Sequence, residues 1–119
     1  MGVSVSVTSG DPSRVLSHAT LEAGKFLGLT QADLSAVIGR HRTNIAKGLN
    51  PESKEGELAM MLIRCYRSLY ALLDGNAEHI KHWMRTENHG TGGVPAEQIR
   101  SIQGLYRVQV YLDAMRGKL

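Results

Sequence analysis

The stretch HWMRTENHGTGGVP, residues 82–95, contains side chains that are typical of metal and phosphate sites. His79 and His82 lie three residues apart, a spacing that places two imidazoles on one face of a helix, as zinc ligands often are. However, Ile80 and Trp83 mark the side of that helix that faces the protein interior, so the histidines fall on the side that faces water. The sequence therefore favours a solvated helix face, and we expect no metal.

The glycines of the same stretch lie just before a predicted helix, where backbone N–H groups can bind a phosphate. The segment GTGGVPAE, residues 90–97, has neither the lysine and serine or threonine pair of a P-loop nor a preceding strand. We therefore expect no nucleotide, no cofactor and no enzymatic activity. A small metal- or nucleotide-dependent enzyme remains a separate hypothesis, and calorimetry with zinc and with NAD would test it.

A structural corner accounts for more of these residues. Trp83 can anchor its helix in the core, the Asn88 side chain can bond its own backbone to start a turn, and glycines permit positive φ. Proline presets the φ of the helix that follows the corner. The residues of this structural signature are Trp83, Asn88, Gly92, Gly93, Pro95 and, as a break before the last helix, Gly104.

Upstream, residues 30–49, TQADLSAVIGRHRTNIAKGL, have the pattern of a helix-turn-helix. Gly39 supplies the tight turn, and Leu34, Ile38 and Ile45 fall at positions that pack the two helices together. In this geometry the second helix presents its N-terminal residues to the major groove of DNA. A helical hairpin with a basic, solvated face is the alternative structural interpretation.

The expected DNA contacts come from both helices of this pair. Residues 40–47 hold three Lys or Arg side chains and no acidic one, and such side chains can bind a guanine edge or a phosphate. The start of the first helix can anchor a further phosphate. The predicted DNA-binding residues are Thr30, Gln31, Arg40, His41, Arg42, Thr43 and Lys47.

The elements that must position these residues are predicted to be helices, with capping residues Asp11, Thr30 and Asn76 at three helix starts and Asp33 as the capping-box partner of Thr30. Residues 1–10, where valines alternate with polar residues, form a flexible or strand-like arm; residues 11–53 form the DNA-binding region; and residues 54–119 form a central helix and a small C-terminal domain. Two adjacent apolar stripes between about Lys54 and Asp74 predict a central helix of the core, or a seam between two copies of the chain. The first stripe is Leu58, Leu62, Cys65, Leu69 and Leu72, and the second is Ala59, Ile63, Tyr66, Tyr70 and Leu73. The expected fold class is all-α.

The composition agrees with a compact domain that has an anionic partner. Of the 119 residues, 42% are hydrophobic and 21% are charged, with a formal net charge of +3. Cys65 is the single cysteine, which excludes an intramolecular disulfide and favours a reducing compartment. The longest apolar run, Leu58 to Ile63, is too short to cross a bilayer. We therefore expect a cytoplasmic protein with no membrane contact.

The C-terminal part of the sequence has Trp83, Thr86, Asn88, paired glycines and Pro95 in this order, followed by an apolar helix and a further glycine. This order resembles the C-terminal toxin-binding domain of Xre/MbcA/ParS antitoxins. In this chain the pattern is W-M-R-T-x-N-x-x-x-G-G-x-P followed by I-x-S-I-x-G-L-x-x-V. With an Xre/Cro-like helix-turn-helix before it, the arrangement is similar to the antitoxin of a type II RES–Xre toxin–antitoxin system. The resemblance covers roughly residues 14–117, and Thr91 stands where the family usually has an apolar residue.

The resemblance implies an all-helical protein that forms a homodimer within a hetero-oligomer with a RES-domain toxin, an enzyme that consumes NAD. It implies that the chain blocks the active site of the toxin with its C-terminal end, the toxin-binding residues Arg116, Gly117, Lys118 and Leu119. It also implies that the helix-turn-helix represses transcription of the operon by binding operator DNA. The alternative is a stand-alone phage- or plasmid-type repressor without a toxin partner, which residues 30–49 alone would support.

Overall fold

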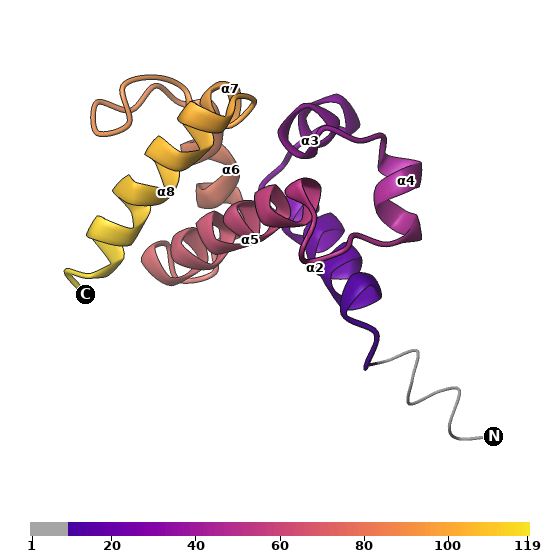
Figure 1. The fold of residues 1–119 in the computed structure, drawn as a ribbon. Coiled ribbons are helices and arrows are strands. Elements are labelled where there is room, and N and C mark those ends of the chain that lie inside the picture. The colour runs from indigo at the N-terminus through magenta and orange to yellow at the C-terminus, as the bar shows by residue number, and fades with distance from the viewer. Residues whose placement is uncertain (1–9) are drawn as a thin grey trace.

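The computed structural model describes residues 10–119, and this part of the chain contains helices and loops but no strand (Figure 1). The helices are α2 (Pro12–Phe26), α3 (Gln31–Ile38), α4 (Arg42–Lys47), α5 (Lys54–Leu72), α6 (Ala77–Arg85), α7 (Pro95–Gln98) and α8 (Ile102–Arg116). The predicted all-α class is confirmed. The arm predicted for residues 1–10 lies, apart from Gly10, outside the described residues.

Polar side chains at the helix N-termini fix where three of the predicted helices begin. The Asp11 carboxylate accepts a hydrogen bond of 3.1 Å from a backbone N–H of α2, and the Asn76 side chain accepts one of 3.0 Å from α6. Thr30 and Asp33 form a capping box at the start of α3, each accepting from the backbone N–H of the other at 3.0 Å. Local sequence signals therefore predicted these helix starts well.

Two further helices begin with a serine that is followed by a glycine three residues later. The Ser53 hydroxyl accepts from the Gly56 N–H at the start of α5, and the Ser101 hydroxyl accepts from the Gly104 N–H at the start of α8, each at 3.0 Å. A Cβ on Gly56 would lie 2.0 Å from a backbone carbonyl oxygen of the preceding turn, and one on Gly104 would lie 1.8 Å from another. Both glycines are required by this close approach of the backbone.

The prediction that Gly104 separates two helices is therefore wrong. Gly104 lies inside the first turn of α8, and the break between α7 and α8 falls earlier, between Gln98 and Ile102. Glycine has the lowest helix propensity of the residues other than proline, which made the position look like a helix end. Here the absence of a side chain lets the preceding turn pack against the start of the helix.

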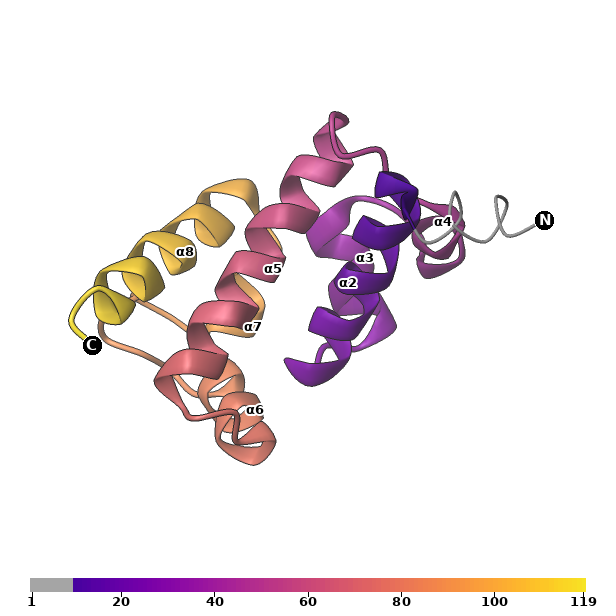
Figure 2. The ribbon, with the colours of Figure 1, turned by 90° about the horizontal axis from the view of Figure 1, so that it is seen from below.

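Helix α5 is the central element, and α2 and α8 pack on two sides of it (Figure 2). Its first predicted stripe is largely buried, with Leu62, Cys65 and Leu69 at most 3% exposed. The second stripe is buried only in part, since Tyr70 is 48% exposed. The ring of Tyr70 packs with Phe26 at the edge of the α2–α5 interface, at a centroid distance of 5.7 Å, instead of entering the core.

The buried apolar residues form one continuous cluster from α2 to α8. Leu16 of α2, Ile45 of α4, Leu62 of α5, Met84 of α6 and Leu112 of α8 all belong to it. Figure 1 nevertheless places α3 and α4 on one side of α5, and α6, α7 and α8 on the other. The division at residues 53 and 54 into a DNA-binding region and a C-terminal domain stays a prediction.

Candidate functional site

The pair α3 and α4 is joined by a tight turn at Gly39, whose φ of 84° is in the left-handed region that favours glycine. Leu34, Ile38 and Ile45, which the spacing predicted to be packing residues, are buried in the apolar core. Helix α4 is also tied to α2, because the buried Ser17 hydroxyl donates a hydrogen bond to the Ile45 carbonyl. The short helix α4 is thus fixed from two sides.

Three of the predicted DNA-binding residues come together in one hollow. Thr30 and Gln31 at the start of α3 and Arg42 at the start of α4 line this hollow, whose volume is about 200 Å³. Lys25 from the last turn of α2 lines it as well and was not predicted. The sequence signal for Lys25 was its position as a basic residue just before the helix-turn-helix. Such a residue extends the charged surface onto the preceding helix, α2.

The other predicted DNA-binding residues lie on α4 or in the turn before it, outside this hollow. His41, Thr43 and Lys47 are exposed, and Arg40 is partly buried. The His41 side chain makes no capping hydrogen bond, so its imidazole is not engaged by the helix that it precedes. Together with the hollow, these residues make α4 and the turn before it a basic surface.

A network of charges centred on Asp33 connects α3 with the C-terminal half of the chain. Arg85, at the end of α6, donates a hydrogen bond of 2.7 Å to the Asp33 carboxylate and one of 3.0 Å to the Gly28 carbonyl. Arg100, between α7 and α8, lies 3.6 Å from the same carboxylate. The sequence indicates Asp33 only as a capping residue, since nothing local to it points to partners so distant in the chain.

The pKa of Asp33 is lowered from its ordinary value of 3.8 by these contacts. Burial by itself raises the pKa of this carboxyl, but the N–H of Thr30 and the guanidinium of Arg85 stabilise the charged form more strongly. The Asp33 side chain is only 12% exposed, whereas that of Arg85 is 45% exposed. The carboxylate is therefore the more buried member of this ion pair, and its charged form is stabilised by the Thr30 N–H and the Arg85 guanidinium.

The loop between α6 and α7 is a hydrogen-bonded corner. The Asn88 side chain accepts from the N–H groups of Gly90 and Thr91 at 2.7 and 3.3 Å, and the Asn88 N–H donates to the Gly93 carbonyl at 2.8 Å. Gly92 has a φ of 82°. The expected turn at Asn88 is thus present, with positive φ at one of the paired glycines.

Thr91 stands where the family that this sequence resembles usually has an apolar residue. It is buried, with an exposed fraction of 1%. Its hydroxyl is within hydrogen-bond distance of the Asn88 and Gly93 carbonyls, at 3.4 and 3.3 Å, to which it can donate. Its own backbone carbonyl accepts a hydrogen bond of 2.6 Å from the Gln98 side-chain amide. These bonds satisfy the polar atoms that burial takes from water. Threonine therefore fits inside the corner without an unpaired hydroxyl.

The corner is held against α8 by aromatic contacts. The rings of Trp83 and Tyr111 are stacked at a centroid distance of 6.4 Å, so Trp83 lies beside the core, partly buried, and not at its centre. A Cβ on Gly90 would lie 2.1 Å from the Tyr111 ring, which makes Gly90 a further required glycine that the sequence analysis missed. Pro95 is buried at the start of α7.

The histidines of α6 lie on the exposed face, where the apolar pattern placed them. His79 and His82 are both exposed, and the Thr86 hydroxyl donates a hydrogen bond of 2.6 Å to the His82 carbonyl. Between residues 10 and 119, no three His, Cys, Asp or Glu side chains are arranged to hold a metal ion. The thiol of Cys65 is buried, and this burial raises its pKa to about 12.

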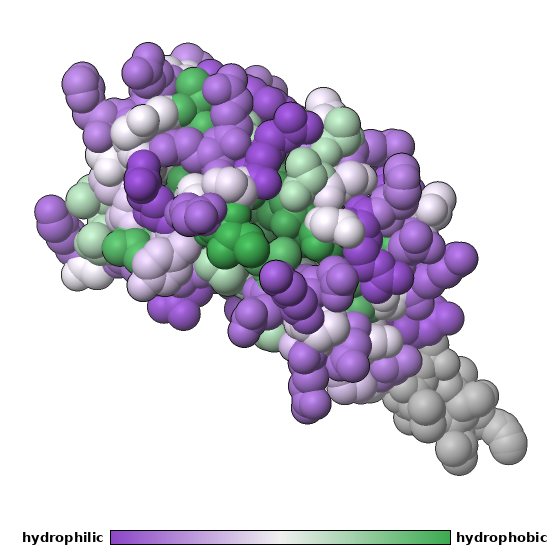
Figure 3. All heavy atoms as spheres, turned by 45° about the horizontal axis from the view of Figure 1, so that its top comes forward, coloured by the Kyte–Doolittle hydropathy of each residue, from purple (hydrophilic) through white to green (hydrophobic). Residues whose placement is uncertain are grey.

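Helix α8 carries exposed apolar side chains on its outer face. Ile102, Tyr106 and Val110 repeat every four residues and are 51%, 59% and 45% exposed. Beyond the helix, residues 116–119 are exposed. The space-filling view in Figure 3 shows apolar side chains gathered near the middle of the face in view, with hydrophilic ones around them.

These features define an all-helical protein whose described surface offers a basic helix end, an apolar helix face and a rigid corner. Residues 68–118, just under half of the chain, match the family described as the antitoxin Xre/MbcA/ParS C-terminal toxin-binding domain. The match supports an antitoxin-type domain whose partner is a toxin protein. No curated protein matches the sequence.

The matched region contains the end of α5, the α6–α7 corner and α8. The predicted structural signature and the predicted tail contacts, except Leu119, lie within it. No helix between residues 10 and 119 combines the length and apolar character that a membrane span needs.

Proposed function

We propose that this protein is an antitoxin that binds a RES-domain toxin, blocks its active site and so prevents the consumption of NAD. The match of residues 68–118 to a toxin-binding antitoxin domain carries this proposal. The NAD chemistry belongs to the toxin, and the antitoxin contributes only a surface. The RES class of the toxin follows from the resemblance of the corner signature together with the upstream helix pair.

The exposed face of α8 and the residues after it are the proposed contact surface for the toxin. Ile102, Tyr106 and Val110 would bury apolar area, and an exposed aromatic at the centre of such a stripe is a typical anchor of protein interfaces. Residues 116–119 would extend from this face into the entrance of the toxin's active site. The last turn contributes two positive charges there, from Arg116 and Lys118.

Co-expression tests this proposal. The chain is paired with the product of the adjacent gene, which the proposal expects to be a RES-domain toxin, produced from an inducible promoter with and without the antitoxin. We expect growth arrest and NAD depletion with the toxin alone, and restored growth and NAD with the antitoxin. Replacement of residues 116–119 by glycine and serine, or Tyr106→Glu, should abolish the rescue, while Arg107→Glu on α8 should not. Persistent NAD loss in the presence of the wild-type chain would refute the proposal.

The chain is also proposed to repress its own operon through α4, as a homodimer on operator DNA. Support comes from the accessible basic surface formed by Arg40, Arg42 and Lys47, and from the hollow that Thr30 and Gln31 share with Arg42. In dimeric helix-turn-helix proteins, recognition helices lie one DNA turn apart, so two copies would read a palindromic site. A mobility shift with the promoter region of the operon tests this function separately from toxin neutralisation.

A stand-alone repressor without a toxin partner is the second candidate function. The geometry of α3 and α4 favours it equally, because DNA binding does not require the C-terminal half to bind a toxin. Purification of the tagged chain from its native cells distinguishes the two. Recovery of a toxin in stoichiometric amount supports the antitoxin, and operator binding without any such partner supports the repressor.

A further inference from the structure

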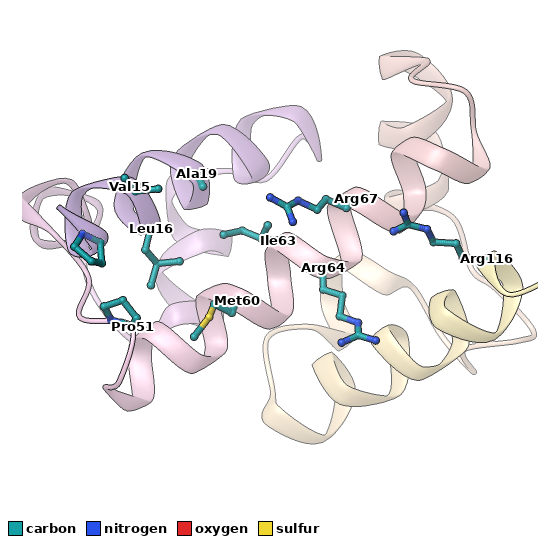
Figure 4. Close-up of a pocket in the computed structure, with 10 residues that line it drawn as sticks. Val15, Leu16, Ala19, Pro51, Met60, Ile63, Arg64, Arg67 and Arg116 are labelled. Atoms are coloured by element: carbon teal, nitrogen blue, oxygen red, sulfur yellow. The ribbon is translucent and has the colours of Figure 1, made fainter. Parts of the chain in front are cut away.

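A groove between α2 and α5 is apolar at its base and basic at its rim (Figure 4). Its volume is about 590 Å³, and Leu16 and Ile63 form part of its buried wall. Val15 and Met60, which also line it, remain 53% and 45% exposed. Apolar side chains gathered in a hollow at the surface are typical of a site that a partner covers.

The charged side chains that line this groove are all basic. Its lining includes Arg64, Arg67 and Arg116 but no acidic side chain. Arg64 points toward α8 in Figure 4, where it pairs with Asp113 at 3.1 Å. Arg67 and Arg116 form no ion pair with any residue between 10 and 119. Two neighbouring guanidinium groups without a counter-charge are a binding site for carboxylates.

The apolar and basic parts follow one another along α5. Met60 and Arg67 are separated by seven residues, a rise of about 10 Å in a helix. Arg67 and Arg116 also line a second hollow together with Tyr66 and Tyr70, so the basic end continues beyond the groove. A helix that packs in the groove would thus place apolar side chains beside Met60 and acidic ones two turns further along.

Two other occupants fit this surface less well. Nucleic acid would use the arginines but would leave the apolar base of the groove without a matching group. A second copy that packs through the same face would bring only this lining to Arg67 and Arg116, and the lining has no acidic side chain that could pair with them. An acidic and apolar segment matches both parts of the surface.

We propose that the α2–α5 groove binds an acidic amphipathic helix of a partner protein. Its apolar side chains pack against Met60 and Ile63, and its carboxylates pair with Arg67 and Arg116. Arg116 is shared with the proposed toxin contact, but the other lining residues of the groove lie outside residues 68–118, so Met60→Glu and Arg67→Glu test the groove separately from toxin neutralisation.

Fluorescence anisotropy with a labelled synthetic helix and the full chain tests the proposal. The probe carries leucines at i and i+4 and glutamates at i+7 and i+8, and the comparison peptide carries lysines in place of the glutamates. We expect the glutamate peptide to bind more tightly by about tenfold or more, with Met60→Glu and Arg67→Glu each removing about tenfold in affinity. Arg107→Glu, on α8 outside the groove, serves as the matched control and should leave the affinity unchanged.

Four results would overturn the proposal. Equal binding of the two peptides, or binding of neither, excludes an acidic helix as the occupant. Dimerisation in sedimentation experiments that Met60→Glu abolishes, without peptide binding, assigns the groove to a second copy. Binding of a random DNA duplex that Arg67→Glu abolishes, again without peptide binding, assigns it to nucleic acid. Met60 and Arg67 are exposed, so both variants should retain the helical circular dichroism of the wild type.

Discussion

Replacement of Asp33 by asparagine tests whether the charge network between α3 and the C-terminal half stabilises the fold. Asparagine has nearly the same shape and keeps an oxygen that can accept the 3.0 Å hydrogen bond from the Thr30 N–H. It removes the negative charge that faces Arg85 at 2.7 Å and Arg100 at 3.6 Å. The substitution therefore isolates the charge from the cap.

The expected loss follows from the difference between charged and neutral hydrogen bonds. A hydrogen bond to a charged group contributes about 1.5 to 3 kcal/mol, and a neutral one about 0.5 to 1.5 kcal/mol. Arg85 is partly exposed, and the Arg100 contact is long, so solvent screens both and little is added for the second. We expect Asp33→Asn to lower the free energy of unfolding by about 1 to 2 kcal/mol.

Urea denaturation at neutral pH measures this loss, with Asp113→Asn as the matched control. Asp113 pairs with Arg64 at 3.1 Å, but the two side chains are 32% and 61% exposed, so its removal should cost less than about 0.5 kcal/mol. Arg85→Gln combined with Asp33→Asn should destabilise by less than the sum of the single variants. Equal costs at the two aspartates, or full additivity of the double variant, would refute the reasoning.

The pH dependence gives an independent check on the same group. Because the pKa of folded Asp33 is lowered, the unfolded chain binds a proton more readily at acidic pH. The contribution of Asp33 is therefore complete above its ordinary pKa of 3.8 and is lost as the pH falls through the lower folded value. The stability difference between wild type and Asp33→Asn should vanish below that range, and a difference that persists there would contradict the ion pair.

Three further predictions concern other parts of the molecule. Arg42→Ala should weaken operator binding by about 1 to 3 kcal/mol in a mobility shift if Arg42 reads a base, whereas Arg107→Ala should have no effect. In thermal unfolding, Gly104→Ala should lower the free energy of unfolding by about 1 to 3 kcal/mol, because the added Cβ would lie 1.8 Å from a carbonyl oxygen. The control Gly117→Ala should be nearly neutral, because the nearest atom to its added Cβ would lie at 3.4 Å. Cys65 should resist a disulfide reagent at pH 8 until urea unfolds the chain, because burial raises the pKa of its thiol to about 12; rapid labelling of the native protein would show that the thiol is accessible. Above the ordinary thiol pKa, the unfolded chain loses this proton first, so stability should fall as the pH rises from about 9 toward 12.

Local signals predicted most helix boundaries, because capping and turn formation depend on a few neighbouring residues. Asp11, Thr30 and Asn76 begin helices, and Gly39 has the left-handed conformation that the turn requires. The corner at Asn88 was predictable for the same reason, since its hydrogen bonds reach only a few residues along the chain.

Contacts between distant residues could not be predicted in this way. Asp33 meets Arg85 only because α6 folds back beside the start of α3, and a single sequence holds no pattern that pairs them. Gly104 shows a related limit, because its role depends on a backbone oxygen of the preceding turn and not on its helix propensity. The groove between α2 and α5 likewise exists only after the two helices pack.

The central claim is that the C-terminal half of this chain neutralises a NAD-consuming toxin. The most direct measurement is the NAD content of cells that produce the proposed RES-domain toxin together with the wild-type chain or with the variant replaced at residues 116–119. We predict that NAD stays at the level of uninduced cells with the wild type and falls with the variant. Depletion of NAD to the same extent with both chains would contradict the account.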